Sequence, residues 1–292
     1  MARIGVVGTR GGWSSEELVR AVEAATGTGT LIDMRQVRLD LSTGELHANG
    51  VDLRSFDALI IKKLGRFYSP NLLDRLEILC WLQEQGVRIF SRPDRIMRLL
   101  DRLSCTLRLQ MAGIPLPPTT ITESIDRAIE AVERYGEAVF KPLYTSKARG
   151  MCLIEHGPQA REQIEEYQRL NPVMYIQKRI DLPGRDLGIV FLGGQYLTTY
   201  ARRQEKGSWT TTTHFGGRYE PFDPSPELIT LAQRAQAPFD LDFTCVDVAE
   251  STDGPVVFEV SPFGGFRGLL EARRIDAAQR YVEYVQARLR PV

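Results

Sequence analysis

Two carboxylates near the C-terminal end stand on what the sequence predicts to be neighbouring strands. Residues 244–248 and 254–261 are apolar, β-branched runs, and the Ser-Thr-Asp-Gly between them is typical of a hairpin turn. Their inward faces carry Asp247, Glu259 and Ser261. Like charges buried side by side need a neutralising cation, and hard oxygen ligands suit Mg²⁺ that keeps water and phosphate oxygens. The pattern predicts a nucleotide-triphosphate site; a solvated carboxylate pair is the alternative, which the apolar neighbours disfavour.

A lysine at the end of another predicted strand could supply the cation that phosphates require. Lys141 precedes the loop 142–150, which is dense in small, hydroxyl and basic residues, including Ser146 and Lys147. Such a loop can close over phosphates with its backbone N–H groups and ammonium groups as donors. Taken alone, a lysine at a strand end is more often simply solvated.

Further basic and hydroxyl side chains follow later in the chain. Arg202 and Arg203 end a predicted strand, and because adjacent strand residues face opposite sides, at most one points into a given cleft. The threonine run 210–213 offers hydroxyls to phosphate or metal, although an edge strand explains it equally well. Arg267 lies in the glycine-rich turn 264–268, where a close backbone and a helix N-terminus favour an anion.

The hydrophobic pattern predicts the elements that position these residues. At the N-terminus strands alternate with helices, which indicates a doubly wound lobe with a parallel sheet; the strands are 4–8, 31–33, 58–62 and 86–90, and the helices 15–25 and 72–85. A helix over 93–112 ends at a proline-rich boundary. Beyond it we expect helices at 124–135, 158–170, 227–237 and 275–289, strands at 138–141, 151–154 and 173–180, a hairpin of 188–192 with 196–202, and a loop over 204–226. The turn 264–268 leads into a helix from about Leu269.

Composition narrows the class of protein. The 292 residues contain 37 Lys plus Arg and 37 Asp plus Glu, so no global charge favours nucleic acid or a membrane surface. No signal-peptide pattern or membrane-spanning run is present, and the expected location is the cytoplasm. The four cysteines, Cys80, Cys105, Cys152 and Cys245, form no Cys-x-x-Cys pair, which favours reduced thiols over a zinc or iron site.

The order of these features resembles the ATP-grasp superfamily, and most closely its RimK-type glutamate ligases. The family shows the same order of features along the chain: Lys141, the loop, the strand pair, the basic strand end, Asp247 and Glu259-Val260-Ser261. The resemblance extends to segments 56–60, 101–103 and 113–115. It implies a fold of class α/β and α+β, with an N-terminal lobe at 1–95 and two α+β lobes, central at 96–176 and C-terminal at 177–292, that clasp the nucleotide.

The same resemblance implies individual roles. Lys141, with the loop residues Ser146 and Lys147, contacts the phosphates of ATP, and Asp186 lies near the ribose. The adenine is read by the interlobe segment Gln177, Lys178, Arg179 and Ile180. Thr210, Thr211 and Thr212 fall where the family has an Arg-Ser-Asn triplet near the phosphates. Asp247, Glu259 and Ser261 fall on its magnesium ligands.

The implied reaction joins a carboxylate to an amine. ATP and Mg²⁺, with Mn²⁺ as an alternative ion, support phosphorylation of the carboxylate to an acyl phosphate, which the amine attacks with release of ADP and phosphate; the substrates are an amino acid, a peptide or a protein. Arg202, Arg203 and Arg267 are the candidates for binding the transferred phosphoryl group or the carboxylate. The alternatives are a nucleotide-binding regulatory or scaffold protein without turnover and, more weakly, a kinase.

Several positions depart from the family pattern. Ser261 replaces an asparagine, Thr210 and Gly188 stand where arginines are frequent, Arg102 replaces a lysine, and Arg267 replaces an acidic residue. The string over 247–250 and 258–268 looks most like the ATP-grasp proteins of the GAK system, which are encoded beside an HprK-related kinase and a small amphipathic protein. That likeness implies a protein or peptide partner. The oligomeric state stays open, a homo-oligomer included.

Overall fold

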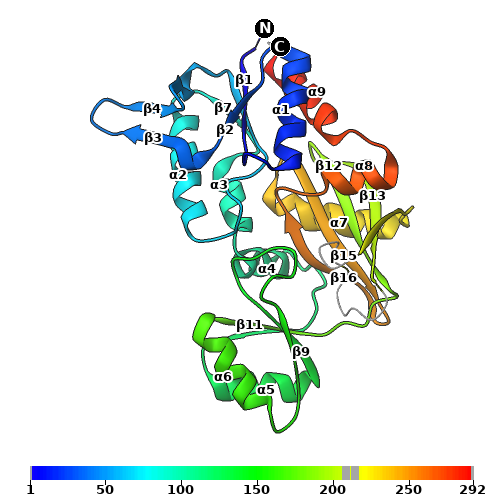
Figure 1. Ribbon diagram of the computed structural model, residues 1–292. Coiled ribbons are helices and arrows are strands. Elements are labelled where there is room, and N and C mark those ends of the chain that lie inside the picture. Colours follow the sequence, from blue (N-terminus) through cyan, green and yellow to red (C-terminus); the bar gives the residue numbers. More distant parts are fainter. Residues whose placement is uncertain (1, 206–210, 212–216, 291–292) are drawn as a thin grey trace.

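The N-terminal part of the chain is built around a parallel sheet (Figure 1). The computed structural model describes residues 2–205, 211 and 217–290. The strand order is β2-β1-β6-β7, and the elements are β1 (Ile4–Val7), α1 (Trp13–Thr26), β2 (Thr30–Ile32), β6 (Ala58–Ile61), α2 (Asn71–Glu84) and β7 (Arg88–Phe90). Leu18 of α1 and Leu76 of α2 belong to different apolar clusters, so the two helices cover opposite faces. The predicted doubly wound arrangement is confirmed.

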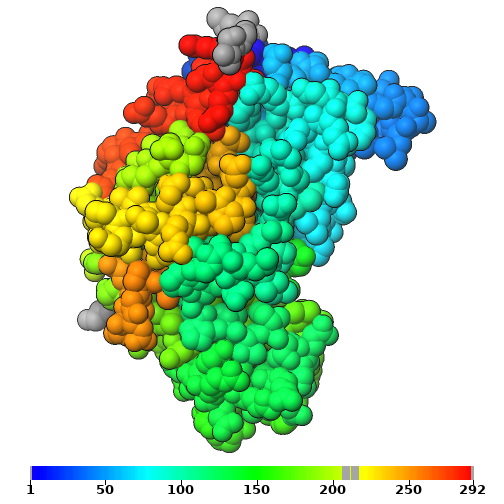
Figure 2. Space-filling model, turned by 180° about the vertical axis from the view of Figure 1, so that it is seen from behind, coloured from blue at the N-terminus to red at the C-terminus, as the bar shows by residue number. Residues whose placement is uncertain are grey.

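A small antiparallel sheet, which the sequence interpretation missed, projects from this part as an arm (Figures 1 and 2). It pairs β3 (Val37–Asp40), β4 (Glu45–Ala48) and β5 (Val51–Asp52), and the short helical turns η1 (Met34–Gln36) and η2 (Leu53–Ser55) flank it. Its turns contain Gly44, Asn49 and Gly50, all at positive φ. Asn-Gly between alternating residues is a strong hairpin signal.

The helix predicted over 93–112 is broken, and this corrects that expectation. The structure has α3 (Pro93–Ile96), η3 (Met97–Leu99) and then a separate helix α4 (Arg102–Met111). Asp101 is extended and caps α4, because its Oδ1 accepts a hydrogen bond from the Ser104 N–H at 2.7 Å. The cap therefore places Arg102 at the first turn of a new helix.

The central sheet is antiparallel, with the order β10-β9-β11-β8. Its elements are β8 (Thr119–Thr122), which was not predicted, α5 (Ile125–Tyr135), β9 (Glu137–Lys141), β10 (Cys152–Glu155), α6 (Ala160–Leu170) and β11 (Met174–Lys178). Ala138 and Phe140 of β9 join the core under α5 and α6, whereas Val139 and Lys141 face a cavity. The two-residue period of a strand thus separates core from site.

The C-terminal sheet is also antiparallel, with the order β14-β13-β12-β15-β16. It contains β12 (Arg185–Leu192), β13 (Gln195–Arg203), β14 (Arg218–Pro221), β15 (Phe243–Ser251) and β16 (Gly254–Ser261), with α7 (Pro226–Gln236), the short turn η5 (Ala237–Phe239), α8 (Phe266–Arg273) and α9 (Ala277–Leu289). Strand β14 lies within the predicted loop 204–226, and α8 begins at Phe266 rather than near Leu269. Both predicted hairpins are present.

The two outer sheets share their apolar cores. One cluster joins Val7 and Leu59 of the parallel sheet to Ile189 and Val248 of the C-terminal sheet, and a second joins Val6 to Val190. The central sheet has its own separate core. All four cysteines are free, and within the described residues no helix is long and apolar enough to cross a membrane. The division at 95/96 and 176/177 stays a prediction.

Candidate active site

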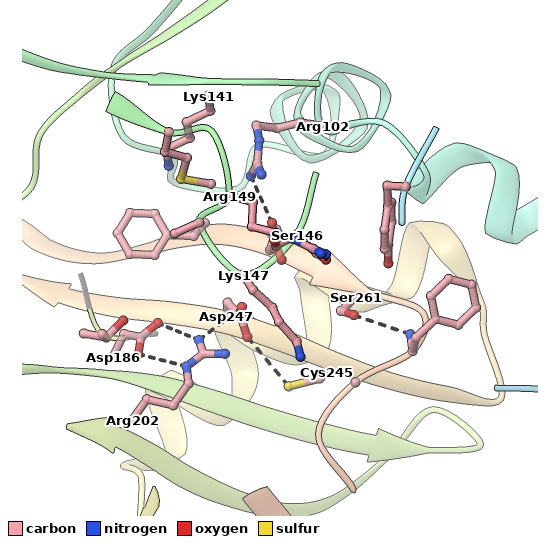
Figure 3. A pocket seen from close by; sticks show the side chains of 18 of the residues that line it. Arg102, Lys141, Ser146, Lys147, Arg149, Asp186, Arg202, Cys245, Asp247 and Ser261 are labelled. Atoms are coloured by element: carbon pink, nitrogen blue, oxygen red, sulfur yellow. Dashed lines mark hydrogen bonds and ion pairs between the residues drawn. The ribbon is translucent and has the colours of Figure 1, made fainter. Parts of the chain in front are cut away.

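A cavity of about 430 Å³ opens where the three large sheets meet (Figure 3). Its lining comes from the segment after β6, from β9 and the loop that follows it, from the end of β11, and from the face of the C-terminal sheet that carries β15 and β16. Residues far apart in the sequence therefore share one space. A pocket with a few convergent charged groups is the usual form of a binding site.

The floor of the cavity is the acidic hairpin. Asp247 of β15 lies opposite Glu259 of β16, and Cys245 lies opposite Ser261. A register shift after Asp247 adds one residue to β16, so that Phe258 as well as Glu259 lines the cavity. The hairpin predicted from the sequence thus brings its two carboxylates and its hydroxyl to one face.

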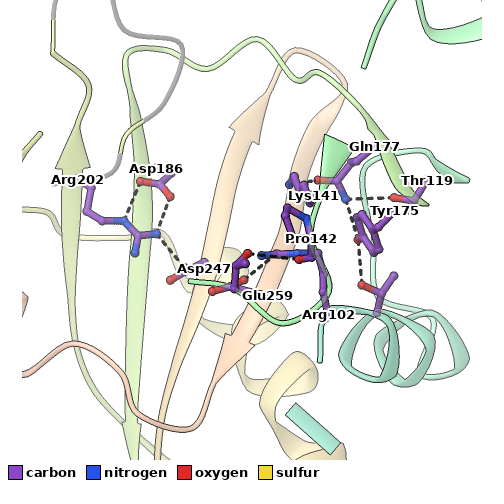
Figure 4. Close-up of polar contacts among 12 residues, drawn as sticks. Arg102, Thr119, Lys141, Pro142, Tyr175, Gln177, Asp186, Arg202, Asp247 and Glu259 are labelled. Carbon is purple, nitrogen blue, oxygen red and sulfur yellow. Dashed lines mark hydrogen bonds and ion pairs between the residues drawn. The ribbon is translucent and has the colours of Figure 1, made fainter. Parts of the chain in front are cut away.

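Each of these carboxylates is paired with an arginine (Figure 4). Arg102 Nη1 lies 3.0 Å from Glu259 Oε2, and the Arg102 side chain is only 6% exposed. Arg202 lies 3.1 Å from Asp247 Oδ2 and also binds both carboxylate oxygens of Asp186. At the floor two guanidinium groups therefore bind three carboxylates.

Burial governs the ionisation of Asp247. Desolvation raises its pKa to about 7, Arg202 opposes that shift, and the charges of Glu259 and Asp186 add to it. A further cation at the floor would favour the ionised form.

The donor set fits a magnesium ion that is shared with a nucleotide. Asp247, Glu259 and Ser261 offer hard oxygen atoms on one face of the hairpin. Among residues 2–205, 211 and 217–290, no group of three or more His, Cys, Asp or Glu side chains is arranged to hold a metal ion by itself. Three such ligands leave coordination positions for phosphate oxygens and water. The buried Nε of Arg102 has no hydrogen-bond partner in the described part of the chain, so this guanidinium keeps donor capacity for an anion.

Lys141 of β9 lies beside the hairpin, with its Nζ 5.2 Å over the Phe258 ring, and a hydrogen-bond network holds it. Its Nζ donates to Gln177 Oε1 at 2.5 Å. The Gln177 amide in turn donates to Thr119 Oγ1 and to the Tyr175 hydroxyl, both at 3.1 Å. Burial, with the Arg102 charge adding to it and Glu259 opposing it, lowers the pKa of Lys141 to about 7. An anion beside Lys141 would restore its charge.

The loop after β9 carries two further cations. Lys147 and Ala148 both have positive φ, at 60° and 55°, a conformation that non-glycine residues adopt at some energetic cost. Lys147 reaches into the cavity toward the hairpin (Figure 3). Arg149 folds back and donates to the Ser146 carbonyl and hydroxyl, both at 3.1 Å. The loop shape thus presents Lys147 to the space above Asp247.

Most of the predicted site residues line this cavity, namely Lys141, Ser146, Lys147, Gln177, Lys178, Arg179, Ile180, Asp186, Arg202, Thr211, Asp247, Glu259 and Ser261. Thr210 and Thr212 lie outside the described residues. The backbone N–H groups of Lys178 and Arg179 donate to the carbonyls of Pro118 and Glu137, so neither is available to a base in this arrangement.

Two predicted arginines lie away from the cavity lining. Arg203 pairs with Glu220 on β14, and its side chain is 51% exposed. Arg267 sits 5.0 Å over the Trp13 ring at the start of α1. Of the pair at the end of β13, only Arg202 faces the cavity.

Among the lining residues that sequence reasoning overlooked are Lys63, Arg66 and Tyr68. They follow β6 and so lie at the carboxyl edge of the parallel sheet. Ligands usually bind at that edge of such sheets. The basic dipeptide Lys62-Lys63 at the end of β6 was the sequence signal that could have predicted these lining residues.

Comparison with known proteins places this geometry among ATP-grasp enzymes. The family model for the RimK-like ATP-grasp domain matches residues 100–285. A tetrahydromethanopterin:alpha-L-glutamate ligase from Methanosarcina acetivorans is 25% identical, over 94% of this chain and 95% of its own length. A probable alpha-L-glutamate ligase from Thioalkalivibrio sulfidiphilus is 26% identical, over 96% of this chain and 93% of its own length.

Solved structures show the same fold. The ATP-grasp ligase PsnB, in a complex with a phosphomimetic variant of its minimal precursor, Mg and ADP, superposes with a TM-score of 0.76 at 16% identity, covering 98% of both chains. A RimK domain ATP-grasp protein from Sphaerobacter thermophilus gives a TM-score of 0.74 at 22% identity, covering 97% of this chain and 99% of that one.

Proposed function

Because the chain belongs to the RimK-like ATP-grasp family, we propose that it is an ATP- and magnesium-dependent ligase that joins a carboxylate to an amine with release of ADP. One observation carries the proposal: Asp247 and Glu259 lie side by side on the hairpin and face the same cavity as the half-buried Lys141. Carboxylates that hold a metal ion, near a lysine that binds phosphate, form the arrangement that phosphoryl transfer requires.

The chemistry needs positioning and charge more than proton transfer. A carboxylate oxygen of the substrate attacks the γ-phosphorus of ATP, the bond to the β-phosphate oxygen breaks, and ADP leaves. The amine nitrogen then attacks the carbonyl carbon of the acyl phosphate, loses a proton and expels phosphate. When bound, Mg²⁺ would lie at Asp247, Glu259 and Ser261 and offset the phosphate charge.

The arginines at the floor have a defined part in this proposal. Arg102 and Arg202 pair with Glu259 and Asp247. With Mg²⁺ bound at these carboxylates, the two guanidinium groups would be able to turn their donors to the transferred phosphoryl group. Lys141, drawn toward the phosphates, would gain the proton that desolvation disfavours.

The test uses hydroxylamine in place of the unknown amine, because it converts an acyl phosphate to a hydroxamate. ADP and hydroxamate are measured with glutamate and a panel of short peptides as carboxylates. We expect Glu259→Gln to reduce both products roughly a hundredfold or more, because it removes a metal ligand. Glu250→Gln is the matched control: Glu250 is on the same hairpin but pairs with Arg185 outside the cavity lining, and it should leave both rates unchanged.

Turnover that is insensitive to Glu259→Gln would overturn the metal assignment. Mass spectrometry of the bound nucleotide separates the ligase from a regulatory protein without turnover. A triphosphate that stays intact through prolonged incubation with every carboxylate and hydroxylamine would favour the regulatory protein.

A further inference from the structure

One buried lysine near the acidic hairpin has no carboxylate partner. Lys62 directly follows β6 of the parallel sheet, and it is only 2% exposed. Among residues 2–205, 211 and 217–290, no Asp or Glu side chain lies within ion-pair distance of its Nζ. Burying an amino group costs free energy unless its N–H groups find acceptors. The acceptors of Lys62 must therefore be uncharged groups.

These acceptors are two backbone carbonyls that lie 201 and 202 residues further along the chain. The Nζ of Lys62 donates to the Phe263 oxygen at 2.9 Å and to the Gly264 oxygen at 3.0 Å. It also lies 3.6 Å from the centroid of the Phe266 ring. Gly264 packs so closely on β15 that an added Cβ would lie 2.2 Å from the Cys245 Cβ. This turn is therefore held between the parallel sheet and the acidic hairpin.

The same turn sets the position of Ser261, the third proposed metal ligand. Phe263, whose carbonyl Lys62 holds, donates its own N–H to Ser261 Oγ at 3.4 Å (Figure 3). Ser261 has the shortest side chain of the three proposed ligands, with one rotatable bond before its oxygen. Because that bond has only a few staggered positions, the backbone decides where the hydroxyl lies. Groups that bind a metal ligand from behind commonly orient it for the ion.

Holding the fold together does not require an amino group at position 62. Apolar clusters already join the parallel sheet to the C-terminal sheet, and Phe243 and Phe266 beside Lys62 belong to one of them. An apolar side chain would pack there without the cost of burying a polar group. It would not hold the two carbonyls, and a buried carbonyl that loses its donor either shifts or stays unpaired at a cost in free energy.

We propose that Lys62 is a positioning residue of the metal site: it fixes the backbone after Ser261, so that the Ser261 hydroxyl completes the set of oxygen ligands offered by Asp247 and Glu259. This inference rests on the proposed ligase function, which assigns Mg²⁺ to these three residues. The N-terminal part of the chain then contributes to metal affinity, although none of the three proposed ligands belongs to it.

The experiment measures how much Mg²⁺ strengthens nucleotide binding. A non-hydrolysable ATP analogue is titrated by calorimetry into each protein, once with saturating Mg²⁺ and once with EDTA, and we call the ratio of the two affinities the metal gain. We expect Lys62→Met to lower the metal gain roughly tenfold, as loss of a partner behind a metal ligand typically does. The affinity in EDTA should stay within about twofold, because the nucleotide contacts proposed for Lys141 and Gln177 come from the central sheet, which has its own core. A variant that only weakened the fold would lose both.

Two further variants make the test specific. Arg88→Met is the matched control, because Arg88 of β7 also donates from the parallel sheet to a distant carbonyl, that of Arg288 at 2.6 Å, but lies outside the cavity lining. It should leave the metal gain unchanged. Lys62→Gln keeps a donor on a side chain one atom shorter, which cannot reach both carbonyls, and should lower the metal gain about threefold. It provides the test if Lys62→Met does not fold.

A double-variant cycle asks whether Lys62 acts through Ser261. In a Ser261→Ala background, Lys62→Met should change the metal gain little further, because the group that Lys62 positions is gone. An unchanged metal gain in Lys62→Met or Lys62→Gln, an equal loss of affinity in EDTA, or an undiminished effect in the Ser261→Ala background would each overturn the proposal. Failure of the ligase function shows differently: Mg²⁺ then gives no gain in the unaltered protein, or the gain survives Glu259→Gln.

Discussion

Lys141 is a half-buried lysine whose charge depends on what lies beside it. Its pKa is lowered to about 7, mainly by desolvation. Triphosphate oxygens favour the protonated form, so binding of ATP above pH 7 must take up a proton. Above pH 7 the free protein carries fewer protons at Lys141 than the ATP complex does. The affinity for ATP therefore falls as the pH rises from 7 toward 9.

For Lys141 we predict that the affinity for ATP falls by up to tenfold per pH unit, and that proton uptake makes the calorimetric enthalpy of binding depend on the buffer. The measurement starts at pH 7.5, because burial raises the pKa of Asp247 to about 7. Below pH 7.5 a cation beside Asp247 releases protons on binding, and this changes the pH dependence of the affinity in the opposite direction. In Lys141→Arg the dependence should flatten, since arginine stays charged. The same pH slope in that variant would assign the proton to another group.

Residue by residue, the sequence predicted the parts of the site that local pattern controls. Alternation in β15 and β16 was enough to bring Asp247 and Glu259 to one face. The pairing of Glu259 with Arg102, 157 residues away, depends on how a capped helix docks on the hairpin, and no local pattern contains that. The same reason explains why Lys63 was missed.

At the scale of elements, one aromatic ring at the cavity explains why a glycine stands on β12. Gly188 pairs across the sheet with Tyr200, and a Cβ added at Gly188 would lie 2.4 Å from the Tyr200 ring. The ring occupies similar space beside Gly265 and Gly268, where an added Cβ would come within 2.8 Å or less. Tyr200 therefore fills the room that a side chain at position 188 would need.

The prediction is that Gly188→Ala lowers the free energy of unfolding by roughly 1–3 kcal/mol, the typical cost of overpacking a core. Urea denaturation measures the change. In a Tyr200→Ala background the same substitution should cost much less, because the obstructing ring is gone. Gly157→Ala, at an open position with no atom within 4 Å of the added Cβ, is the matched control and should be close to neutral. Additive effects at positions 188 and 200 would contradict this account.

Long periodic elements were predictable, whereas one helix break and several short strands were not. The helices α1, α2, α5 and α6 and the hairpins β12–β13 and β15–β16 follow hydrophobic periods that the fold obeys. The break before α4 depends on a single cap by Asp101 within an otherwise helical pattern. Strands β5 and β8 have two and four residues, too few to show a period.

At the scale of the whole molecule, the outer sheets act as one body. Lys62, buried at the end of the parallel sheet, donates to the carbonyls of Phe263 and Gly264 at 2.9 and 3.0 Å, directly after the acidic hairpin. The shared apolar clusters join the same two parts. The central sheet has a separate core and lies apart from the other two large sheets (Figure 1). Its strands β9 and β11 contribute Lys141 and Gln177 to the cavity lining. Ligands that touch different walls should therefore protect different segments.

Hydrogen exchange followed by mass spectrometry can separate these contributions in the intact protein. With Mg²⁺ and a non-hydrolysable ATP analogue, we expect severalfold slower exchange in 142–149 and 177–180, because these segments line the proposed nucleotide side. Segment 63–68 lines the same cavity from the N-terminal part of the chain and should be protected as well. The projecting arm, 37–52, lies outside the cavity lining and serves as the internal control. Equal protection of the projecting arm and of 142–149 would contradict binding of the nucleotide in the cavity.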